Sequence, residues 1–406
     1  MHGSKIKVLF YDNSIGFGGA IKSLALVLPS LQQSVVPIVM TCQHSSIINK
    51  WIVGCSVVRY WRPTNYVLRE RLGLWLSQKK VPGTLKFLIL KCYASLDWVQ
   101  DFILSCHISC VAKLNRVDII HMNTGHPPEA IRAAAWVRTP YVVHLRGIIA
   151  DQKGIRTRAE LSRAEGFIAV SDTVAKSAIE AGAPENKMVV LHDPVDLKLF
   201  ERSAHLRQSI RQVLGIKDDE VAVGIFGRVI PWKGQLQFVQ ACLCAMDEDR
   251  KIKAVIVGDE SDGSSDYFNG IKEVIARSSH GNRFVLAGYQ EVVEGYYCAM
   301  DIVVHSSIEP EPFGMVVPEG MAAGKPVIAA NEGGPSEIIK HGIDGFLVSP
   351  KNTDMFARNI ISLSTNPEKR KQVGENAKAK AMRQFSIEEC SRGILKLYGN
   401  LLGLEF

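Results

Sequence analysis

Short apolar runs alternate with stretches of helical periodicity along the first half of the chain. The apolar runs lie at residues 7–11, 36–40, 118–122, 141–145, 167–170 and 188–191, and helical patterns occur at 20–31 and 129–137. Apolar runs of this length are typical of strands that are covered on both faces. We therefore predict an α/β domain of Rossmann type, with a parallel sheet.

The same alternation restarts in the second half of the chain. Apolar runs at 221–226, 254–257, 283–286, 302–305, 326–329 and 346–348 predict a second Rossmann-like domain, and residues 386–402 have the pattern of an amphipathic helix. We place the two domains at 1–196 and 197–385. Segment 51–115 does not alternate, and we interpret it as a mainly helical insertion in the first domain.

Composition narrows the class of protein. The nine cysteines show no metal-ligand spacing, and nothing at the start resembles a secretory signal, which predicts reduced thiols in a cytoplasmic protein. No apolar run approaches the roughly 18 residues that a bilayer-spanning helix needs. We therefore expect a protein that does not cross a membrane.

The excess positive charge is concentrated in segment 50–116. This segment holds eleven Lys and Arg against three acidic residues, whereas the whole chain has a net charge of +7. Its four tryptophans are Trp51, Trp61, Trp75 and Trp98. Basic residues beside tryptophans suit a surface that meets anionic lipid headgroups. A solvated face over an ordinary core is the alternative interpretation.

Two cations follow the first strand of the second domain. Arg228 follows the run 221–226 after one glycine, Gly227, and Lys233 precedes a predicted helix. Cations at the carboxyl edge of a parallel sheet, beside the start of a helix, suit a pyrophosphate. As an isolated motif this arrangement also fits a solvated turn.

A second motif carries two carboxylates. Glu311 and Glu319 are eight residues apart, and the second lies in a predicted short helix over 316–323. The free amides of Gly314, Met315 and Val316 would point at an anion, while the carboxylates could accept hydrogen bonds from sugar and ribose hydroxyls. Helix capping is the alternative role for such acids.

Together these motifs resemble the donor-site signature of the family 4 retaining glycosyltransferases. The resemblance rests on Arg228, Lys233, Glu311, Glu319 and residues 333–337, and it covers nearly all of residues 190–365. It implies the GT-B fold, with two facing Rossmann-like domains and a final helix that crosses back to the first. Residues 386–406 would then belong with the first domain.

The resemblance also assigns roles in the second domain. Arg228 and Lys233 would clamp the donor diphosphate, Glu319 would bind the ribose hydroxyls, and Glu311 would hold the transferred sugar. Gly314, Met315 and Val316 would complete the donor site. Because two cations can neutralise a departing diphosphate, we expect no metal and no cofactor, only a donor such as a UDP-sugar or a GDP-sugar.

In the first domain the resemblance assigns three further residues. Gly18 and Gly19 match a glycine turn that lets backbone amides approach the phosphates, and His144 matches a histidine that contacts the sugar. The glycines could also serve only to turn the chain, and the histidine could be a satisfied core residue. Asp247, Glu248 and Asp249 have metal-site spacing, but we interpret them as a solvated turn.

The resulting hypothesis is a retaining hexosyltransferase of the EC 2.4 class. The sugar would pass from a nucleotide-sugar to an acceptor hydroxyl, and the acceptor would be a lipid-linked sugar or glycolipid in cell-surface polysaccharide synthesis. Segment 51–115 would hold the enzyme peripherally at the inner face of the cytoplasmic membrane, and we expect no nucleic-acid partner. The alternatives are a GT-B epimerase or phosphorylase, a non-catalytic sugar-binding protein and, more weakly, a dehydrogenase. The sequence leaves the base, sugar, linkage and oligomeric state open.

Overall fold

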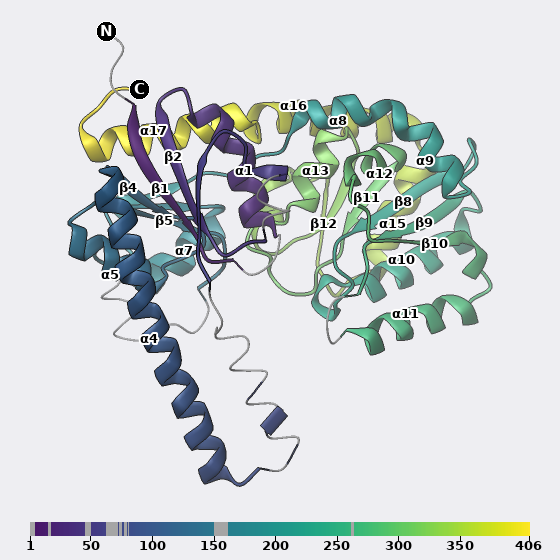
Figure 1. Ribbon diagram of the computed structural model, residues 1–406. Coiled ribbons are helices and arrows are strands. Elements are labelled where there is room, and N and C mark those ends of the chain that lie inside the picture. Colours follow the sequence, from purple (N-terminus) through teal and green to yellow (C-terminus); the bar gives the residue numbers. More distant parts are fainter. Residues whose placement is uncertain are drawn as a thin grey trace. The chain divides into compact units, whose positions relative to one another are not determined.

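The computed structural model describes residues 5–14, 18–44, 50–61, 72, 75–76, 79, 81–149, 161–260 and 264–406 (Figure 1). The chain divides into two compact units. Unit 1 comprises Met1–Ala169, Ala175–Leu191 and Ser391–Phe406, and unit 2 comprises Val170–Val174 and His192–Cys390. The C-terminal residues therefore return to the unit in which the chain begins.

Unit 1 is built on a parallel sheet of seven strands in the order β3-β2-β1-β4-β5-β6-β7. The strands are β1 (Ile6–Asp12), β2 (Val35–Thr41), β3 (Ser56–Arg59), β4 (Ile119–Met122), β5 (Tyr141–Leu145), β6 (Gly166–Ala169) and β7 (Met188–Val190). Every residue of β4, β5 and β6 is buried, as expected for strands with helices on both faces. The six apolar runs are confirmed as strands.

The interpretation of segment 51–115 as a mainly helical insertion is wrong at β3. This strand pairs in parallel with β2 and forms an edge of the sheet. It has only four residues, and Ser56 and Arg59 at its ends are exposed. A short edge strand of this kind leaves no continuous apolar run, which explains why the hydrophobic pattern did not indicate it.

The α-helices in the described part of unit 1 connect or cover these strands. They are α1 (Gly19–Leu31), α4 (Gly83–Asn115), α5 (Pro128–Val137), α7 (Asp172–Glu180, whose first residues are assigned to unit 2) and most of α17 (Ile387–Leu402). All buried residues of α4 lie at or beyond Leu104, and Figure 1 shows the first half of α4 standing away from the unit 1 sheet. No helix among the described residues is long and apolar enough to span a bilayer.

Unit 2 contains a parallel sheet of six strands in the order β10-β9-β8-β11-β12-β13. The strands are β8 (Val221–Phe226), β9 (Ile252–Val257), β10 (Phe284–Gly288), β11 (Ile302–His305), β12 (Val327–Ala330) and β13 (Phe346–Val348). The helices are α8 (Leu197–Ser203), α9 (Arg207–Val213), α10 (Gln235–Glu248), α11 (Ser265–Arg277), α12 (Val293–Ala299), α13 (Val316–Ala322), α14 (Gly334–Ile338), α15 (Thr353–Ser364) and α16 (Pro367–Gln384). All six strands predicted for the second domain are confirmed.

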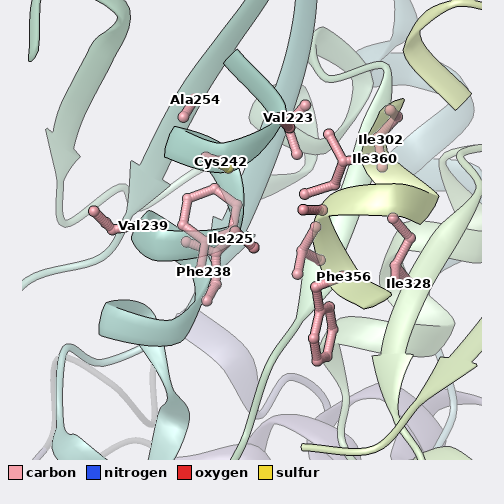
Figure 2. Packing of buried hydrophobic residues seen from close by; sticks show 14 of the residues in the cluster. Val223, Ile225, Phe238, Val239, Cys242, Ala254, Ile302, Ile328, Phe356 and Ile360 are labelled. Carbon is pink, nitrogen blue, oxygen red and sulfur yellow. The ribbon is translucent and has the colours of Figure 1, made fainter. Parts of the chain in front are cut away.

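Two helices pack against one face of the unit 2 sheet. Phe238 of α10 and Phe356 of α15 are buried in one cluster with Val223 and Ile225 of β8 and with Ile328 of β12 (Figure 2). Burying a large apolar side chain stabilises the fold by roughly 1.5–3 kcal/mol. This core fixes β8, β11 and α10, the elements from which the candidate site extends.

The cysteines form no disulfide, and three of them, Cys242, Cys298 and Cys390, are buried. All nine are free thiols, and Cys242 lies in the same apolar cluster. Burial raises the pKa of the Cys242 thiol well above its usual value. The redox state of the thiols stays a prediction.

Candidate functional site

The loop after β8 carries the two predicted cations. Arg228 is exposed, and its side chain forms no ion pair or hydrogen bond with the described part of the chain. Lys233 ends the short helix η3 (Pro231–Lys233), and its ammonium lies 4.5 Å from the ring centroid of Trp232. Arg228 is thus available to a ligand, whereas Lys233 is held against the Trp232 ring.

Close backbone packing joins this loop to the loop after β11. Gly234 has a φ of +71°, and a Cβ atom at this position would lie 1.9 Å from the carbonyl oxygen of Ser306. The Ser306 hydroxyl donates to the Gly234 carbonyl at 2.8 Å, and the Ile308 amide donates to the Trp232 carbonyl at 2.8 Å. Only glycine fits at position 234, and the resulting contact places Lys233 beside the second loop.

Glu311 accepts hydrogen bonds from three side chains through one oxygen. Its Oε1 lies 2.7 Å from Lys233 Nζ and 2.7 Å from His305 Nε2, and it also accepts from the Ser307 hydroxyl. Burial by itself would raise the pKa of Glu311, but the interactions with His305 and Lys233 outweigh it and hold the pKa well below its usual range. Glu311 is therefore a carboxylate at neutral pH.

The second oxygen of Glu311 remains available. No hydrogen bond with the described residues uses Oε2, since the three donors all converge on Oε1. A carboxylate oxygen accepts hydrogen bonds from hydroxyl groups. The arrangement can therefore fix the carboxylate with one oxygen and present the other to a polyol.

A glycine also shapes the loop that carries Glu311. Gly333 has a φ of +65°, and a Cβ atom there would lie 2.3 Å from the Glu311 carbonyl oxygen. The Gly334 amide donates to this same carbonyl at 2.9 Å. The loop after β12 thus packs directly against the backbone of the Glu311 loop. The predicted motif at 333–337 therefore has a structural role.

Helix α13 begins directly after the Glu311 loop. Met315 is its N-cap residue, and Val316 is its first residue. The amides of Gly314, Met315 and Val316 donate no hydrogen bond within the described part of the chain, whereas the Gly314 carbonyl accepts from Val317 at 2.9 Å. Three unsatisfied donors at a helix start can bind an anion.

Glu319 lies on α13 and is half-buried. Its Oε2 accepts a 2.8 Å hydrogen bond from the hydroxyl of Tyr297, whose ring stacks on Phe226 with centroids 3.7 Å apart. Burial, reinforced by the charge of Glu319, raises the pKa of Tyr297 well above its usual value, so its hydroxyl keeps its proton. The end of β8 and helix α12 therefore position Glu319 together.

In unit 1, Gly18 and Gly19 begin helix α1. Gly18 is the N-cap residue, with a φ of −117° and a ψ of −177°, and Gly19 is the first helical residue. A Cβ atom added at either position would meet nothing within 4 Å. Neither the backbone conformation nor the packing within the described residues requires glycine here, which argues against a purely conformational role.

His144 is buried at the end of β5. Its Nδ1 lies 3.2 Å from His121 Nε2 and 3.4 Å from Arg146 Nη2, while its Nε2 has no hydrogen-bond partner among the described residues. Burial lowers the pKa of His144 well below its usual value, and the charge of Arg146 adds to this effect. A buried ring nitrogen without a partner contrasts with the interpretation of a satisfied core histidine.

Further buried polar residues, which the sequence analysis missed, lie at the carboxyl ends of the unit 1 strands. Asp12 at the end of β1 accepts a 2.9 Å hydrogen bond from Asn123, whose oxygens in turn accept from Arg146. Burial raises the pKa of Asp12, although its hydrogen bonds to Asn123 and Ser14 oppose this shift. Ligands of open parallel sheets bind at this edge.

The structure brings some predicted residues together and leaves others apart. Lys233 and Glu311 form a direct ion pair, whereas Glu319 accepts a hydrogen bond from Tyr297 and the Arg228 side chain forms no ion pair with the described residues. His305 and Ser307 were missed, although His305 ends a strand that the sequence predicted. A histidine at the carboxyl end of a parallel strand was the signal that could have found it.

Two further polar residues, Ser171 and Asp247, have contacts of a structural kind. The Ser171 hydroxyl accepts from the Val174 amide at 3.1 Å, which is the geometry of a helix N-cap. Asp247 pairs with His280 on the surface, at the end of α10 opposite to Lys233, about 20 Å away by the helical rise. Among the described residues, no cluster of three or more His, Cys, Asp or Glu could hold a metal ion.

Two family models match the chain. The model of glycosyl transferases group 1 matches residues 207–380, and the model of Glycosyltransferase Family 4 matches residues 92–199. The first region contains Arg228, Lys233, Glu311 and Glu319, and the second contains His144.

Curated relatives match in part. An uncharacterised glycosyltransferase of Methanocaldococcus jannaschii is 28% identical over 257 residues, covering 61% of this chain and 64% of the relative. The lipopolysaccharide 1,2-N-acetylglucosaminetransferase of Salmonella typhimurium is 29% identical over 238 residues, covering 57% of this chain and 62% of that enzyme. The chain thus spans less than two thirds of the length of these two relatives.

Solved structures match over nearly the whole chain. The HepE protein of Anabaena in complex with UDP has a TM-score of 0.78 at 25% identity, covering 97% of this chain and 100% of that chain. A glycosyltransferase from Rickettsia africae has a TM-score of 0.79 at 22% identity, covering 98% and 99%. These similarities confirm the predicted GT-B class of fold.

Proposed function

Because residues 207–380 match the model of glycosyl transferases group 1, we propose that the protein transfers a sugar from a nucleoside-diphosphate sugar to an acceptor hydroxyl. The observation that carries this proposal is the part-buried ion pair of Lys233 and Glu311, together with the exposed Arg228 in the same loop as Lys233. This arrangement offers cations to a diphosphate and a carboxylate to sugar hydroxyls within two adjoining loops.

The two cations would stabilise the leaving diphosphate. As the bond between the sugar and the β-phosphate breaks, negative charge grows on the phosphate, and Arg228 and Lys233 would stabilise that charge. Lys233 Nζ has three protons and uses one for Glu311, so the others remain for phosphate oxygens. Each charge-assisted contact contributes roughly 1.5–3 kcal/mol.

Glu311 and Glu319 would orient the two polyol parts of the donor. The free Oε2 of Glu311 would accept from the transferred sugar, and Glu319 would accept from the ribose. The amides of Gly314, Met315 and Val316 would bind the diphosphate between them. Because its pKa is held low, Glu311 serves as an acceptor of hydrogen bonds and not as a proton donor.

Unit 1 residues take their roles from the family resemblance. Gly18 and Gly19 would allow backbone amides to approach the phosphates, and His144 would contact the sugar. The open space beside both glycines and the unpartnered Nε2 of His144 support these roles.

The reaction is proposed to retain the anomeric configuration and to proceed without a metal. Retention would follow a front-face displacement in which the leaving phosphate accepts the proton of the acceptor hydroxyl. Two protein cations can neutralise a diphosphate as a metal would, which supports metal independence. A transfer assay in the presence and absence of EDTA, with the product linkage determined by NMR, tests both points.

A thermal-shift screen tests the donor proposal. Anabaena HepE has been crystallised with UDP and with UDP-glucose, so UDP-sugars come first, followed by GDP- and ADP-sugars. We expect one base to raise the melting temperature of the wild type and to have no effect on Glu319→Ala. If no nucleotide stabilises the wild-type protein, the donor-site proposal is wrong.

For the acceptor, we propose a lipid-linked sugar or glycolipid of cell-surface polysaccharide synthesis, reached at the inner face of the cytoplasmic membrane. The Salmonella relative is named for lipopolysaccharide, which supports this class. Segment 51–115 supports it too, because α4 exposes Phe87, Leu88 and Trp98 beside Lys86 and Lys91. Apolar and basic side chains on one helix suit an anionic lipid surface.

Co-sedimentation with vesicles tests the membrane contact. With phosphatidylglycerol vesicles at low salt, we expect binding that is weakened roughly thirtyfold by Lys86→Glu combined with Lys91→Glu, since each basic residue contributes about 1 kcal/mol. The control is the double variant Lys217→Glu and Lys251→Glu on exposed positions of unit 2, which changes the net charge equally. Equal binding by both double variants would exclude α4 as the lipid contact.

An epimerase or phosphorylase of the same fold and a non-catalytic sugar-binding protein are the remaining alternatives. A transferase releases free nucleoside diphosphate only when acceptor is present. An epimerase changes the sugar without acceptor, a phosphorylase requires inorganic phosphate, and a binding protein produces no nucleoside diphosphate under any of these conditions.

A further inference from the structure

A chain of three buried side chains ends at His144. The hydroxyl of Tyr398, on the C-terminal helix α17, lies 2.6 Å from His121 Nδ1, and His121 Nε2 lies 3.2 Å from His144 Nδ1. The exposed fractions of Tyr398, His121 and His144 are 0%, 1% and 2%. All three belong to unit 1. The tyrosine is 277 residues from His121, so no local pattern indicates this contact.

The protonation states of His121 and His144 limit how these hydrogen bonds can be arranged. Burial lowers the pKa of His121 to about 3 and that of His144 well below its usual value, and in both cases the charge of Arg146 adds to the shift. Both imidazoles are therefore neutral near pH 7, and each carries one ring proton. That proton is on either Nδ1 or Nε2.

Arg146, together with the hydrogen bonds that join Tyr398, His121 and His144, sets which nitrogen carries the proton. Its Nη2 lies 3.4 Å from His144 Nδ1, and a guanidinium can only donate hydrogen bonds. His144 Nδ1 must therefore accept, so the proton of His144 is on Nε2. His121 Nε2 then donates to His144 Nδ1, and His121 Nδ1 accepts from the hydroxyl of Tyr398.

We infer that Tyr398 and His121 are positioning residues that hold His144 as its Nε2–H tautomer, a hydrogen-bond donor to an oxygen of the sugar donor. The Nε2 atom is buried and has no partner among the described residues, so its hydrogen-bonding capacity is not used by them. The ligand atom must be an acceptor, such as a hydroxyl or phosphate oxygen, and His144 cannot act as a general base from this nitrogen. The role toward the sugar donor rests on the proposed function, but the tautomer does not.

The tautomer is tested on the ligand-free protein. Long-range ¹H–¹⁵N correlation spectra of the imidazoles distinguish the two tautomers, and the His121→Gln and His144→Gln variants assign the signals. We expect both rings to be neutral at pH 7 with the proton on Nε2. A proton on His144 Nδ1, or protonation of His144 near pH 6.5, would overturn the inference. This measurement does not require turnover, so its outcome is independent of the proposed activity.

The positioning role is tested with paired variants. Tyr398→Phe removes the donor to His121, and we expect His144 to show a mixture of tautomers and kcat/KM to fall about tenfold, the effect of losing one oriented hydrogen bond. His121→Gln keeps an N–H donor toward His144 and should preserve its tautomer, whereas His121→Phe should not. Leu397→Val loosens packing of the same helix against Gly166 and controls for helix docking. An unchanged His144 tautomer in Tyr398→Phe and His121→Phe would refute the positioning role.

Discussion

The ammonium of Lys233 and the carboxylate of Glu311 lie 2.7 Å apart, although 78 residues separate them in the chain. The exposed fractions of their side chains are 17% and 6%. The pair keeps a carboxylate ionised in a largely buried place and keeps a lysine at the edge of the two loops. A diphosphate that binds there would share a cation whose position is already fixed, which reduces the entropy lost on binding.

Arg228→Ala separates binding from stability. Because the Arg228 side chain is exposed and forms no ion pair or hydrogen bond with the described residues, we expect the free energy of unfolding to stay within about 0.5 kcal/mol of the wild type. The loss of a charge-assisted contact to phosphate should lower kcat/KM by roughly 10- to 150-fold. Urea unfolding and steady-state kinetics measure the two quantities, and near-normal turnover would refute the assignment of Arg228.

Lys233→Met should affect stability as well as turnover. Without the ammonium, the buried Glu311 carboxylate loses one of its three donors, and we expect about 1–3 kcal/mol of destabilisation. Adding Glu311→Gln to this variant should recover part of the stability but none of the activity. If the double variant is as unstable as the sum of the two single variants, the pair is not energetically coupled.

The same pair predicts a dependence of stability on pH. The folded-state pKa of Glu311 lies below the ordinary value of 4.5. Its contribution to stability is therefore complete above that value and is lost as the pH falls towards the folded-state pKa. Chemical unfolding between pH 3 and 7 should show a smaller loss of stability below pH 4.5 in Glu311→Gln than in the wild type. Identical pH profiles would contradict the depressed pKa.

Gly19→Ala tests the close approach of a ligand to helix α1. A Cβ atom there meets nothing within 4 Å, and alanine favours the helix by roughly 0.5–1 kcal/mol over glycine. We expect unchanged or higher stability but weaker nucleotide-sugar affinity. Gly83→Ala is the matched control, because Gly83 also begins a helix and also has open space beside it. Equal donor affinity in both variants would indicate that Gly19 only turns the chain.

A pair of variants separates the role of Glu319 in stability from its proposed role in nucleotide binding. Glu319→Ala leaves the buried Tyr297 hydroxyl without this acceptor, which should cost about 1–3 kcal/mol of stability. Adding Tyr297→Phe removes the unsatisfied hydroxyl and should restore most of that loss while keeping the ring stacked on Phe226. Nucleotide-induced thermal shifts should be absent in both. A shift that returns with the double variant would mean that Glu319 acts only through stability.

The sequence by itself determined the two parallel sheets and the positions of the site motifs. Continuous apolar runs mark strands that are buried on both faces, so twelve strands could be predicted, including 221–226 and 302–305 at their observed bounds. The glycine and proline positions around Glu311 mark a loop at a strand end, where sheets of this type bind ligands. The short exposed strand β3 lacks such a run and could not be found in this way.

Only the tertiary structure decided which side chains meet. The contacts of Glu311 with Lys233, of Glu319 with Tyr297, and of His121 with Tyr398 all join distant parts of the chain. Periodicity records which residues are buried, but it carries no information on the partner of a buried polar atom. That partner is fixed by tertiary packing. The contact of Gly234 with Ser306 brings Lys233 to Glu311 and so sets the charge of Glu311. The contact of His121 with His144 sets the tautomer of His144.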